Sequence, residues 1–242
     1  VFGDYDLSSL VTASEGGAKL TGAVQDAFEE TAGVAIKEGY GLTETTGSTH
    51  TQVGSLYGPR HGTVGQPARH TDCRIVDSNG DEVPLGETGE ILVRGPQVME
   101  GYHNRPKANE QAFTDAGFFR TGDIGRRDEE GYYEIVDRKK HVIVTAGYNV
   151  YPSEVENLLA EHESVREAAV VGIPHDRRNE TVKAFVVPAN GDPENPGVTA
   201  DEIQQFSLDN IAPYKHPREV EFVAELPRTA SGKIQKYKLT DE

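Results

Sequence analysis

Residues 132–156 read YYEIVDRKKHVIVTAGYNVYPSEVE. Inside this stretch the sequence changes from a pattern of short strands to one of mixed strands and helices. Apolar and polar residues alternate over Tyr132–Val136, which predicts a strand. The charged run Asp137–Lys140 follows, and Val142–Thr145 is again predicted as a strand. Pro152–His162 is predicted as a helix, because Pro occupies its first turn and two glutamates lie near its start. A charged run between two segments of different sequence pattern is typical of a linker, so we expect a domain boundary at residues 138–140.

Short strands dominate the sequence before this boundary. Between residues 62 and 138, alternating segments such as Arg74–Asp77 and Gly89–Arg94 are separated by turns rich in Gly, Asp and Pro. This pattern indicates a β-rich subdomain. Further upstream, the periodicity predicts a helix near Leu20–Thr31, and a short strand at Val34–Lys37 leads into Gly39–Gly41.

Helices and strands are mixed after the boundary. Strands are predicted at Ala168–Ile173, Thr181–Val187 and Glu219–Val223, with a helix at Thr199–Asn210. Mixed elements over about 100 residues indicate a small α+β domain. The predicted fold class is therefore α+β, with one domain over residues 1–138 and a second over residues 139–242.

The charge balance disfavours one class of partner. The 242 residues include 24 basic and 40 acidic side chains, which gives a formal net charge of −16. Nucleic acid is a poor partner for such a chain, because a phosphate backbone requires clustered Lys and Arg. Two interpretations of the acid excess stay open. One is adaptation to high salt, where screening reduces self-repulsion, and the other is an ordinary acidic enzyme.

The sequence also predicts where the protein resides. No apolar run approaches the roughly 18 residues that a membrane span requires, and Val1–Leu10 lacks the features of a signal peptide. Cys73 is the only cysteine, which is typical of a reducing compartment. The eight histidines show no metal-ligand spacing. We expect a cytoplasmic protein, and we interpret a chain that begins at Val1 instead of Met as a fragment.

Four segments contain candidate functional residues. Gly39–Thr45 reads GYGLTET, in which glycines allow close approach of a ligand, Tyr offers a stacking face, and Thr and Glu oxygens suit phosphate and Mg²⁺. In Phe119–Asp123, an Asp behind a Gly turn can accept hydrogen bonds from ribose hydroxyls. Arg138 can reach a ribose hydroxyl or phosphate, and the last residue of Pro227–Lys233 can neutralise charge that develops in a transition state. Taken singly, each segment also fits a turn, a linker or a surface cation.

In their order and approximate spacing, these segments resemble the downstream core motifs of the adenylate-forming superfamily. This superfamily contains acyl-CoA synthetases, the adenylation domains of peptide synthetases and luciferases. The resemblance extends over the whole chain and includes the stretch from Gly89 to Tyr102 and the segment Tyr151–Glu156. It implies the C-terminal part of a large AMP-binding domain, with the β-rich part as a distorted barrel, followed by a small mobile lid domain.

The resemblance also implies roles for individual residues and three ligands: ATP or AMP, Mg²⁺ and coenzyme A. Lys233 is expected to act in the adenylation step, Glu44 to hold Mg²⁺, and Lys140 to be the hinge of the lid. The remaining residues are expected to contact the nucleotide or to border the pantetheine channel: Gly16, Gly17, Ala18, Gly39, Tyr40, Gly41, Thr43, Asp123, Arg138, Ala146, Gly147 and Tyr148.

The chain departs from the superfamily pattern in three respects. Lys140 stands where Asp is more frequent, and Ile234–Lys236 is less rich in Arg than is usual. The Gly/Ser/Thr-rich phosphate-binding loop, which lies upstream in this superfamily, is not in the sequence. We therefore expect weak nucleotide binding at best and no turnover from the isolated chain.

Several functions remain as alternatives within and outside the superfamily. The run Gly147–Glu154 resembles fatty acyl-CoA ligases most, with arylacrylate (4-coumarate-type) ligases a near second. The partners implied are a small-molecule carboxylic acid, ATP and coenzyme A. A peptide-synthetase module is disfavoured, because no carrier domain follows, and a luciferase shares the same adenylation motifs. The alternative of a different class is a catalytically incompetent fragment that only folds or binds nucleotide weakly. The acid, its chain length and the oligomeric state are not predicted.

Overall fold

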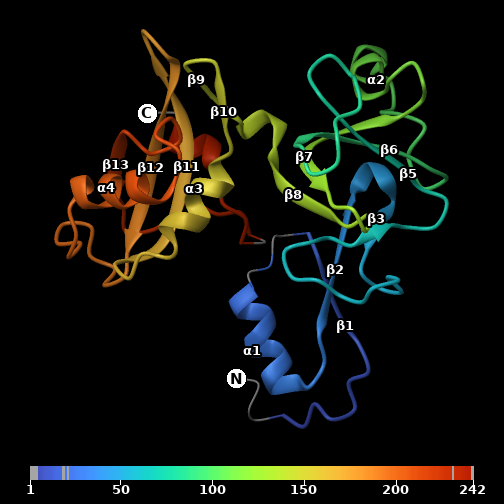
Figure 1. Ribbon diagram of the computed structural model, residues 1–242, viewed down its shortest axis with the longest axis horizontal. Helices are drawn as coiled ribbons and strands as arrows, with labels where there is room; N and C mark the ends of the chain where they lie inside the picture. The colour runs from blue at the N-terminus through green and yellow to red at the C-terminus, as the bar shows by residue number, and fades with distance from the viewer. Residues whose placement is uncertain (1–4, 18–19, 21, 231, 241–242) are drawn as a thin grey trace. The chain divides into compact units, whose positions relative to one another are not determined.

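The chain divides into two compact units, Val1–Val136 and Asp137–Glu242. The computed structural model describes residues 5–17, 20, 22–230 and 232–240. Both units combine helices with sheets, so the α+β class predicted from the sequence is confirmed (Figure 1). The division at residue 136 lies two residues before the end of the first predicted domain.

The first sheet of the first unit carries the GYGLTET motif. Its order is β1 (Ala13–Gly16), β2 (Ile36–Leu42), β3 (Gly47–Thr51) and β4 (Gln66–Pro67). Strands β1 and β2 are parallel and are connected through helix α1 (Gly22–Ala32), whereas the other pairs are antiparallel. The predicted strand at 34–37 is therefore too short, because β2 continues through the motif to Leu42 and ends at the 3₁₀ helix η2 (Thr43–Thr45).

The second sheet of this unit has the order β5 (Asp72–Val76), β6 (Gly89–Arg94), β7 (Phe119–Arg127) and β8 (Tyr133–Arg138). Helix α2 (Pro106–Ala112) lies in the β6–β7 connection. The expected barrel is instead an open sheet in the described residues, because four strands are too few to close around a packed interior. One face of the sheet buries a hydrophobic core, formed by Ile75, Ile91, Val93, Phe119 and Tyr133.

The second unit is built on one five-stranded sheet. Along its path lie β10 (Tyr148–Val150), β9 (Ile143–Thr145), β12 (Asn179–Pro188) and β11 (Val165–His175), and β13 (Glu219–Phe222) pairs with β12 in parallel. Helices α3 (Pro152–Leu159) and α4 (Ala200–Asn210) complete the unit (Figure 1). Two 3₁₀ helices, η3 (Lys139–His141) and η4 (Lys236–Leu239), lie near its ends.

The two long strands of the second unit are buried on both faces. Side chains alternate along a strand, so Ala168 and Val170 face one core and Ala169 and Val171 face another. The first core includes Val155 and Leu159 of α3 and Ile203 of α4. The second core includes Leu226, with Ile234 and Leu239 packed against it. The helices therefore cover one face of the sheet, and the C-terminal segment covers the other.

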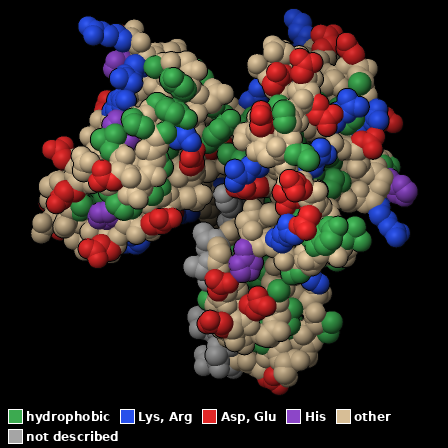
Figure 2. All heavy atoms as spheres, viewed as in Figure 1, with side chains coloured by type: hydrophobic (Ala, Val, Ile, Leu, Met, Phe, Trp, Pro, Cys, Tyr) green, Lys and Arg blue, Asp and Glu red, His purple; other side chains and the backbone are tan. Residues whose placement is uncertain are grey.

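On the face that Figure 2 shows, acidic side chains are scattered over both units and are interspersed with basic ones. Within the described part of the chain, no helix is long and apolar enough to cross a membrane.

Candidate functional site

A cavity of about 770 Å³ opens beside strands β1, β2 and β3 of the first unit. This volume is within the range of about 300–1,000 Å³ that is usual for small-molecule sites. Several of its lining residues are glycines, which have no side chain. Five of the residues predicted to contact a nucleotide line this one cavity: Gly16, Gly17, Gly39, Gly41 and Thr43. Ala18, which was predicted with them, lies outside the described residues.

Gly41 has a structural requirement in addition to the predicted ligand contact. A Cβ atom there would lie 2.0 Å from the carbonyl oxygen of Gly47, at the point where the pairing of β2 and β3 is irregular. The missing side chain thus allows β3 to approach β2. At Gly39 the nearest atom to such a Cβ is 3.4 Å away, which is an ordinary contact. Gly41 is therefore required by the sheet itself, whereas Gly39 leaves room on the side of the cavity.

Tyr40 and Asp123 lie 83 residues apart in the sequence and meet in the structure. The Tyr40 hydroxyl donates a hydrogen bond of 2.5 Å to Oδ2 of Asp123, and the Asp123 side chain is buried with 2% of its surface exposed. Asp123 follows Gly122, whose φ of 68° lies in a bulge of β7, where the pairing with β6 is irregular between Glu90 and Leu92. The alternative interpretation of this segment from the sequence was a turn between strands, but β7 continues through it. The bulge directs Asp123 toward Tyr40.

His50 was not singled out from the sequence, yet it packs behind Tyr40. Its ring centroid lies 5.7 Å from that of Tyr40 and 4.4 Å from that of Tyr133. Complete burial lowers the pKa of His50 to about 3, so the ring is neutral at physiological pH. Thr49 assists the same strand, because its hydroxyl donates to the carbonyl oxygen of Tyr40 over 3.2 Å. The predicted stacking tyrosine is thus supported from behind by buried groups.

Glu44, the predicted metal ligand, is held by the segment around Tyr102. The Tyr102 hydroxyl donates to Oε1 of Glu44 over 2.8 Å, and the backbone N–H of Met99 donates to the Glu44 carbonyl over 2.7 Å. Tyr102 is fixed in turn by the amide of Asn109, which pairs with both its N–H and its carbonyl oxygen. No cluster of three or more His, Cys, Asp or Glu that could hold a metal occurs among the described residues.

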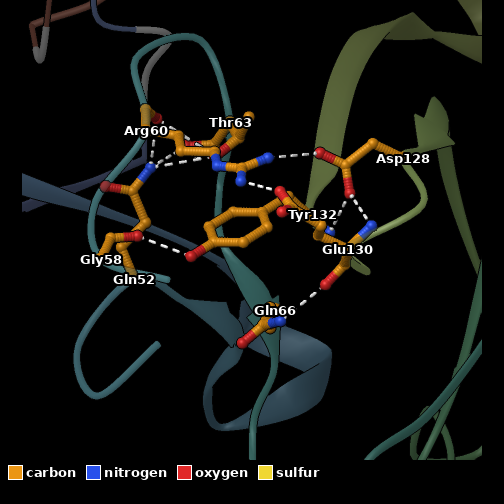
Figure 3. A network of polar contacts seen from close by, with 8 residues as sticks. All are labelled: Gln52, Gly58, Arg60, Thr63, Gln66, Asp128, Glu130 and Tyr132. Atoms are coloured by element: carbon orange, nitrogen blue, oxygen red, sulfur yellow. Dashed lines mark hydrogen bonds and ion pairs between the residues drawn. The ribbon is translucent and has the colours of Figure 1, made fainter. Parts of the chain in front are cut away.

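A network of polar contacts stabilises the loop that follows β3. Gln52 donates to the carbonyl oxygens of Arg60 and Thr63, each over 2.6 Å. Arg60 lies over the ring of Tyr132 and forms ion pairs with Asp128 and Glu130, as Figure 3 shows. The loop is thereby attached to the turn between β7 and β8. Sequence reasoning missed this network, because no local motif distinguishes its members.

The segment with the predicted hinge is organised around Asp137 at the start of the second unit. Oδ2 of Asp137 accepts hydrogen bonds from the backbone N–H and the hydroxyl of Ser153, at 2.8 and 2.7 Å, in the first turn of α3. Burial would raise the pKa of Asp137, but hydrogen bonds from His141 and Ser153 outweigh it and lower the pKa to about 2. The predicted residues Arg138 and Lys140 are exposed beside this buried anchor.

The predicted pantetheine-channel residues form a tight hairpin. Ala146 and Gly147 connect β9 to β10, and both have positive φ, 50° and 86°. A two-residue hairpin of this kind is a type I′ turn, in which Ala is unusual at the first position. Tyr148 is exposed and stacks on Tyr214, with ring centroids 4.5 Å apart.

Lys233 is also on a hairpin, and it is exposed. Arg228 and Ile234 form an antiparallel bridge, and the N–H of Thr229 donates to the carbonyl oxygen of Lys233 over 2.8 Å. Sequence reasoning noted that a lysine after a Ser-Gly turn is usually a mobile surface cation. The structure instead has this lysine on a hydrogen-bonded loop.

The two units thus divide the predicted residues. The first unit contains the cavity, the Tyr40–Asp123 pair and Glu44, and the second contains Arg138, Lys140, Ala146–Tyr148 and Lys233.

Comparison with known families gives two matches. Residues 2–103 match the family of AMP-binding enzymes, and residues 154–233 match the AMP-binding enzyme C-terminal domain.

Similar proteins include a long-chain-fatty-acid–CoA ligase of Bacillus subtilis (strain 168), which is 43% identical over 240 residues, or 98% of this chain and 42% of that protein. A feruloyl-CoA synthase of Amycolatopsis is 40% identical over 231 residues, or 96% of this chain and 46% of that protein. The crystal structure of ATP-bound MatB from Rhodopseudomonas palustris matches with a TM-score of 0.86 and 34% identity, over 95% of this chain and 45% of that one. The chain therefore spans less than half the length of these relatives.

Proposed function

Because this chain belongs to the family of AMP-binding enzymes, we propose that it is the C-terminal part of an AMP-forming acyl-CoA ligase. The intact protein would activate a carboxylic acid with ATP to an acyl-adenylate and pyrophosphate. It would then transfer the acyl group to the thiol of coenzyme A and release AMP. A cytoplasmic location is part of the proposal.

The observation that carries the proposal is the arrangement around the cavity of the first unit. Gly16 and Gly17 of one motif and Gly39, Gly41 and Thr43 of another line it. Tyr40 lies between two of these glycines on β2 but is not a lining residue, and its hydroxyl is bonded to Asp123 of another sheet. An adenosine requires an aromatic face and an acceptor for its ribose hydroxyls, and both are provided here within one unit. We assign base stacking to Tyr40, ribose binding to Asp123 and Arg138, and phosphate contact to Thr43.

The residues present fit Mg²⁺ in the form in which nucleotide enzymes use it. This ion is usually held by one or two carboxylates together with substrate phosphates and water. Glu44 provides one carboxylate, and Tyr102 holds it by donating to Oε1 over 2.8 Å. When bound, the ion would neutralise the phosphate charge of ATP. We assign Glu44 as its protein ligand among the described residues.

The second unit would supply groups for the two half-reactions. In the first, negative charge accumulates on the α-phosphate, and the three donors of the Lys233 ammonium would stabilise it. In the second, the hairpin Ala146–Tyr148 would border the pantetheine arm of coenzyme A. Since one unit carries both groups, we propose that it rotates about Lys140 between the steps.

Two substrate classes are supported by the relatives. We favour a fatty acid, because the long-chain-fatty-acid–CoA ligase of Bacillus subtilis is 43% identical to this chain. An arylacrylate is the second candidate, because the feruloyl-CoA synthase of Amycolatopsis is 40% identical. Much of the acyl pocket is expected in the part of the relatives that this chain does not span.

The test is pyrophosphate release by the intact protein across a panel of carboxylic acids, with and without coenzyme A. We expect release with fatty acids of one chain-length range and thioester formation when coenzyme A is added. Release with ferulate or 4-coumarate alone would favour the second candidate. No release with any carboxylic acid would refute the ligase proposal. Isothermal titration of the isolated chain with AMP is expected to give weak binding, and acyl-CoA formation by this chain alone would refute the assignment of a missing phosphate-binding loop.

A further inference from the structure

The hairpin that carries Lys233 is attached to the second unit at both of its ends. Leu226 is buried in the core beneath β11 and β12, and Ile234 packs against the same core. Beyond the hairpin, Nζ of Lys236 forms an ion pair of 2.7 Å with Glu156 of α3, and both side chains are largely buried. The same Glu156 oxygen accepts the N–H of Val170 in β11 over 2.6 Å. The ends of the hairpin are therefore anchored to the sheet and to a helix.

The turn of the hairpin is held by a different group, the guanidinium of Arg228. Its Nη1 donates to the carbonyl oxygen of Gly232 over 2.7 Å, and its Nη2 pairs with Oε1 of Glu167 in β11. Gly232 directly precedes Lys233, so this bond acts on the peptide unit from which the lysine emerges. The N–H of Gly232 donates to Thr229 over 2.9 Å, and the N–H of Lys233 donates to the Thr229 hydroxyl over 3.1 Å. Arg228 thus connects the turn to the sheet.

Only an arginine can make this connection. A guanidinium presents several donors in a fixed plane, so two of its nitrogens reach two acceptors at once. A lysine ammonium is one point charge on a flexible stem, and it would satisfy either Glu167 or the Gly232 carbonyl. Glu167 in turn fixes the plane of the guanidinium, because it is held in the long strand β11, which pairs with β12 along most of its length.

We propose that Arg228 is a positioning residue for adenylation, which aims Lys233 by holding the Gly232 carbonyl against Glu167 of the sheet. This inference rests on the proposed role of Lys233. In this proposal the loop that carries Lys233 is ordered before the reaction, so movement of the whole unit is enough to place the ammonium. A loop that became ordered only around the nucleotide would lose its conformational entropy during the reaction itself.

The first experiment measures the two half-reactions of the intact protein separately. Arg228→Gln is expected to slow single-turnover pyrophosphate release by about 10- to 100-fold, the cost of a misplaced catalytic group. Thioester formation from supplied acyl-adenylate is expected to change less than about twofold. Arg228→Lys is expected to lose most of the same rate, and Glu167→Gln less, because the bond to Gly232 remains.

The matched control is Arg126→Gln, which removes another exposed arginine–carboxylate pair, with Glu134 in the first unit. We expect it to leave both half-reactions unchanged. The proposal is overturned if Arg228→Gln behaves like this control, if it slows both half-reactions equally, or if Arg228→Lys retains full activity.

The second experiment does not depend on activity. Hydrogen–deuterium exchange of the segment 225–236 is expected to become faster in Arg228→Gln and to stay unchanged in Lys233→Ala and Arg126→Gln. Unchanged exchange in Arg228→Gln would overturn the positioning role. If Lys233→Ala retained full adenylation activity, the proposed function of this lysine would fail, while the exchange result would still decide whether Arg228 orders the turn.

Discussion

The cavity region of the first unit and the Lys233 hairpin of the second differ in how their candidate residues are held. Asp123 and His50 are buried, and they fix Tyr40 from two directions. Lys233 is exposed, and its contacts with the described residues are made through its backbone. A nucleotide site benefits from groups that do not move, because preorganised groups cost nothing to orient during the reaction. The proposed role of Lys233 in one step requires that it be withdrawn in the other, and its exposure is consistent with this proposal.

The largest effect is expected for a substitution of the exposed Lys233. Lys233→Ala in the intact protein should slow adenylation by about 10²–10³-fold, equivalent to about 2.7–4 kcal/mol, because one donor to a developing anion is lost. Thioester formation from supplied acyl-adenylate should be retained. The two rates are measured by pyrophosphate release and by thioester formation, with Lys107→Ala, an exposed lysine of α2, as the control. Loss of both half-reactions to the same degree would contradict the division of labour between the regions.

A substitution in the buried Tyr40–Asp123 pair should lower the stability of the first unit as well as affect binding. Tyr40→Phe removes the donor to a buried carboxylate, and we expect the free energy of unfolding of the first unit to fall by about 1.5–3 kcal/mol. Urea denaturation measures this loss. A double-mutant cycle with Asp123→Asn isolates the pair, and a coupling energy near zero would show that the bond does not hold Tyr40.

Asp137, at the start of the second unit, is also buried, and its ionised carboxylate should contribute to stability. A carboxyl whose pKa is lowered to about 2 in the folded state stabilises the protein above its ordinary pKa near 3.8, and this contribution is lost as the pH falls toward 2. The difference is on the order of 2 kcal/mol at neutral pH. Asp137→Asn should therefore lower the unfolding free energy at pH 7, and the difference from the natural protein should shrink between pH 4 and pH 2. A difference that is constant over this range would contradict the ionised state of Asp137.

The smallest effect is expected at the β9–β10 hairpin. Ala146 has a φ of 50°, which costs an L-residue roughly 1 kcal/mol and costs glycine little. Ala146→Gly should thus raise the melting temperature slightly. Ala160→Gly is the matched control, because this alanine is also exposed in the second unit but has a φ of −67°. It should be destabilising, and the same sign for both variants would exclude relief of strain at Ala146.

Local signals predicted several elements well. The helix at 199–210 is present as α4, because Thr199 and Glu202 form a reciprocal capping box that defines its start. Pro152 begins α3 as expected, although the helix ends at Leu159 and not at His162. Strand β7 was missed as a strand, because its two internal glycines read as turn signals, whereas Gly122 makes a bulge in a continuous strand.

The residue types of the candidate site were readable from the sequence, because GYGLTET and the segment around Lys233 combine several polar groups within a few positions. The contacts that hold these residues in place were not readable from the sequence. The Tyr40–Asp123 bond, the ring of His50 behind Tyr40 and the Arg228–Glu167 pair each join strands or loops that are distant in the chain. A capping box or an amphipathic period depends on neighbours a few residues away, so it is written locally. Burial and long-range hydrogen bonds depend on which strands pair and which faces meet, and these arise only when the whole chain has packed.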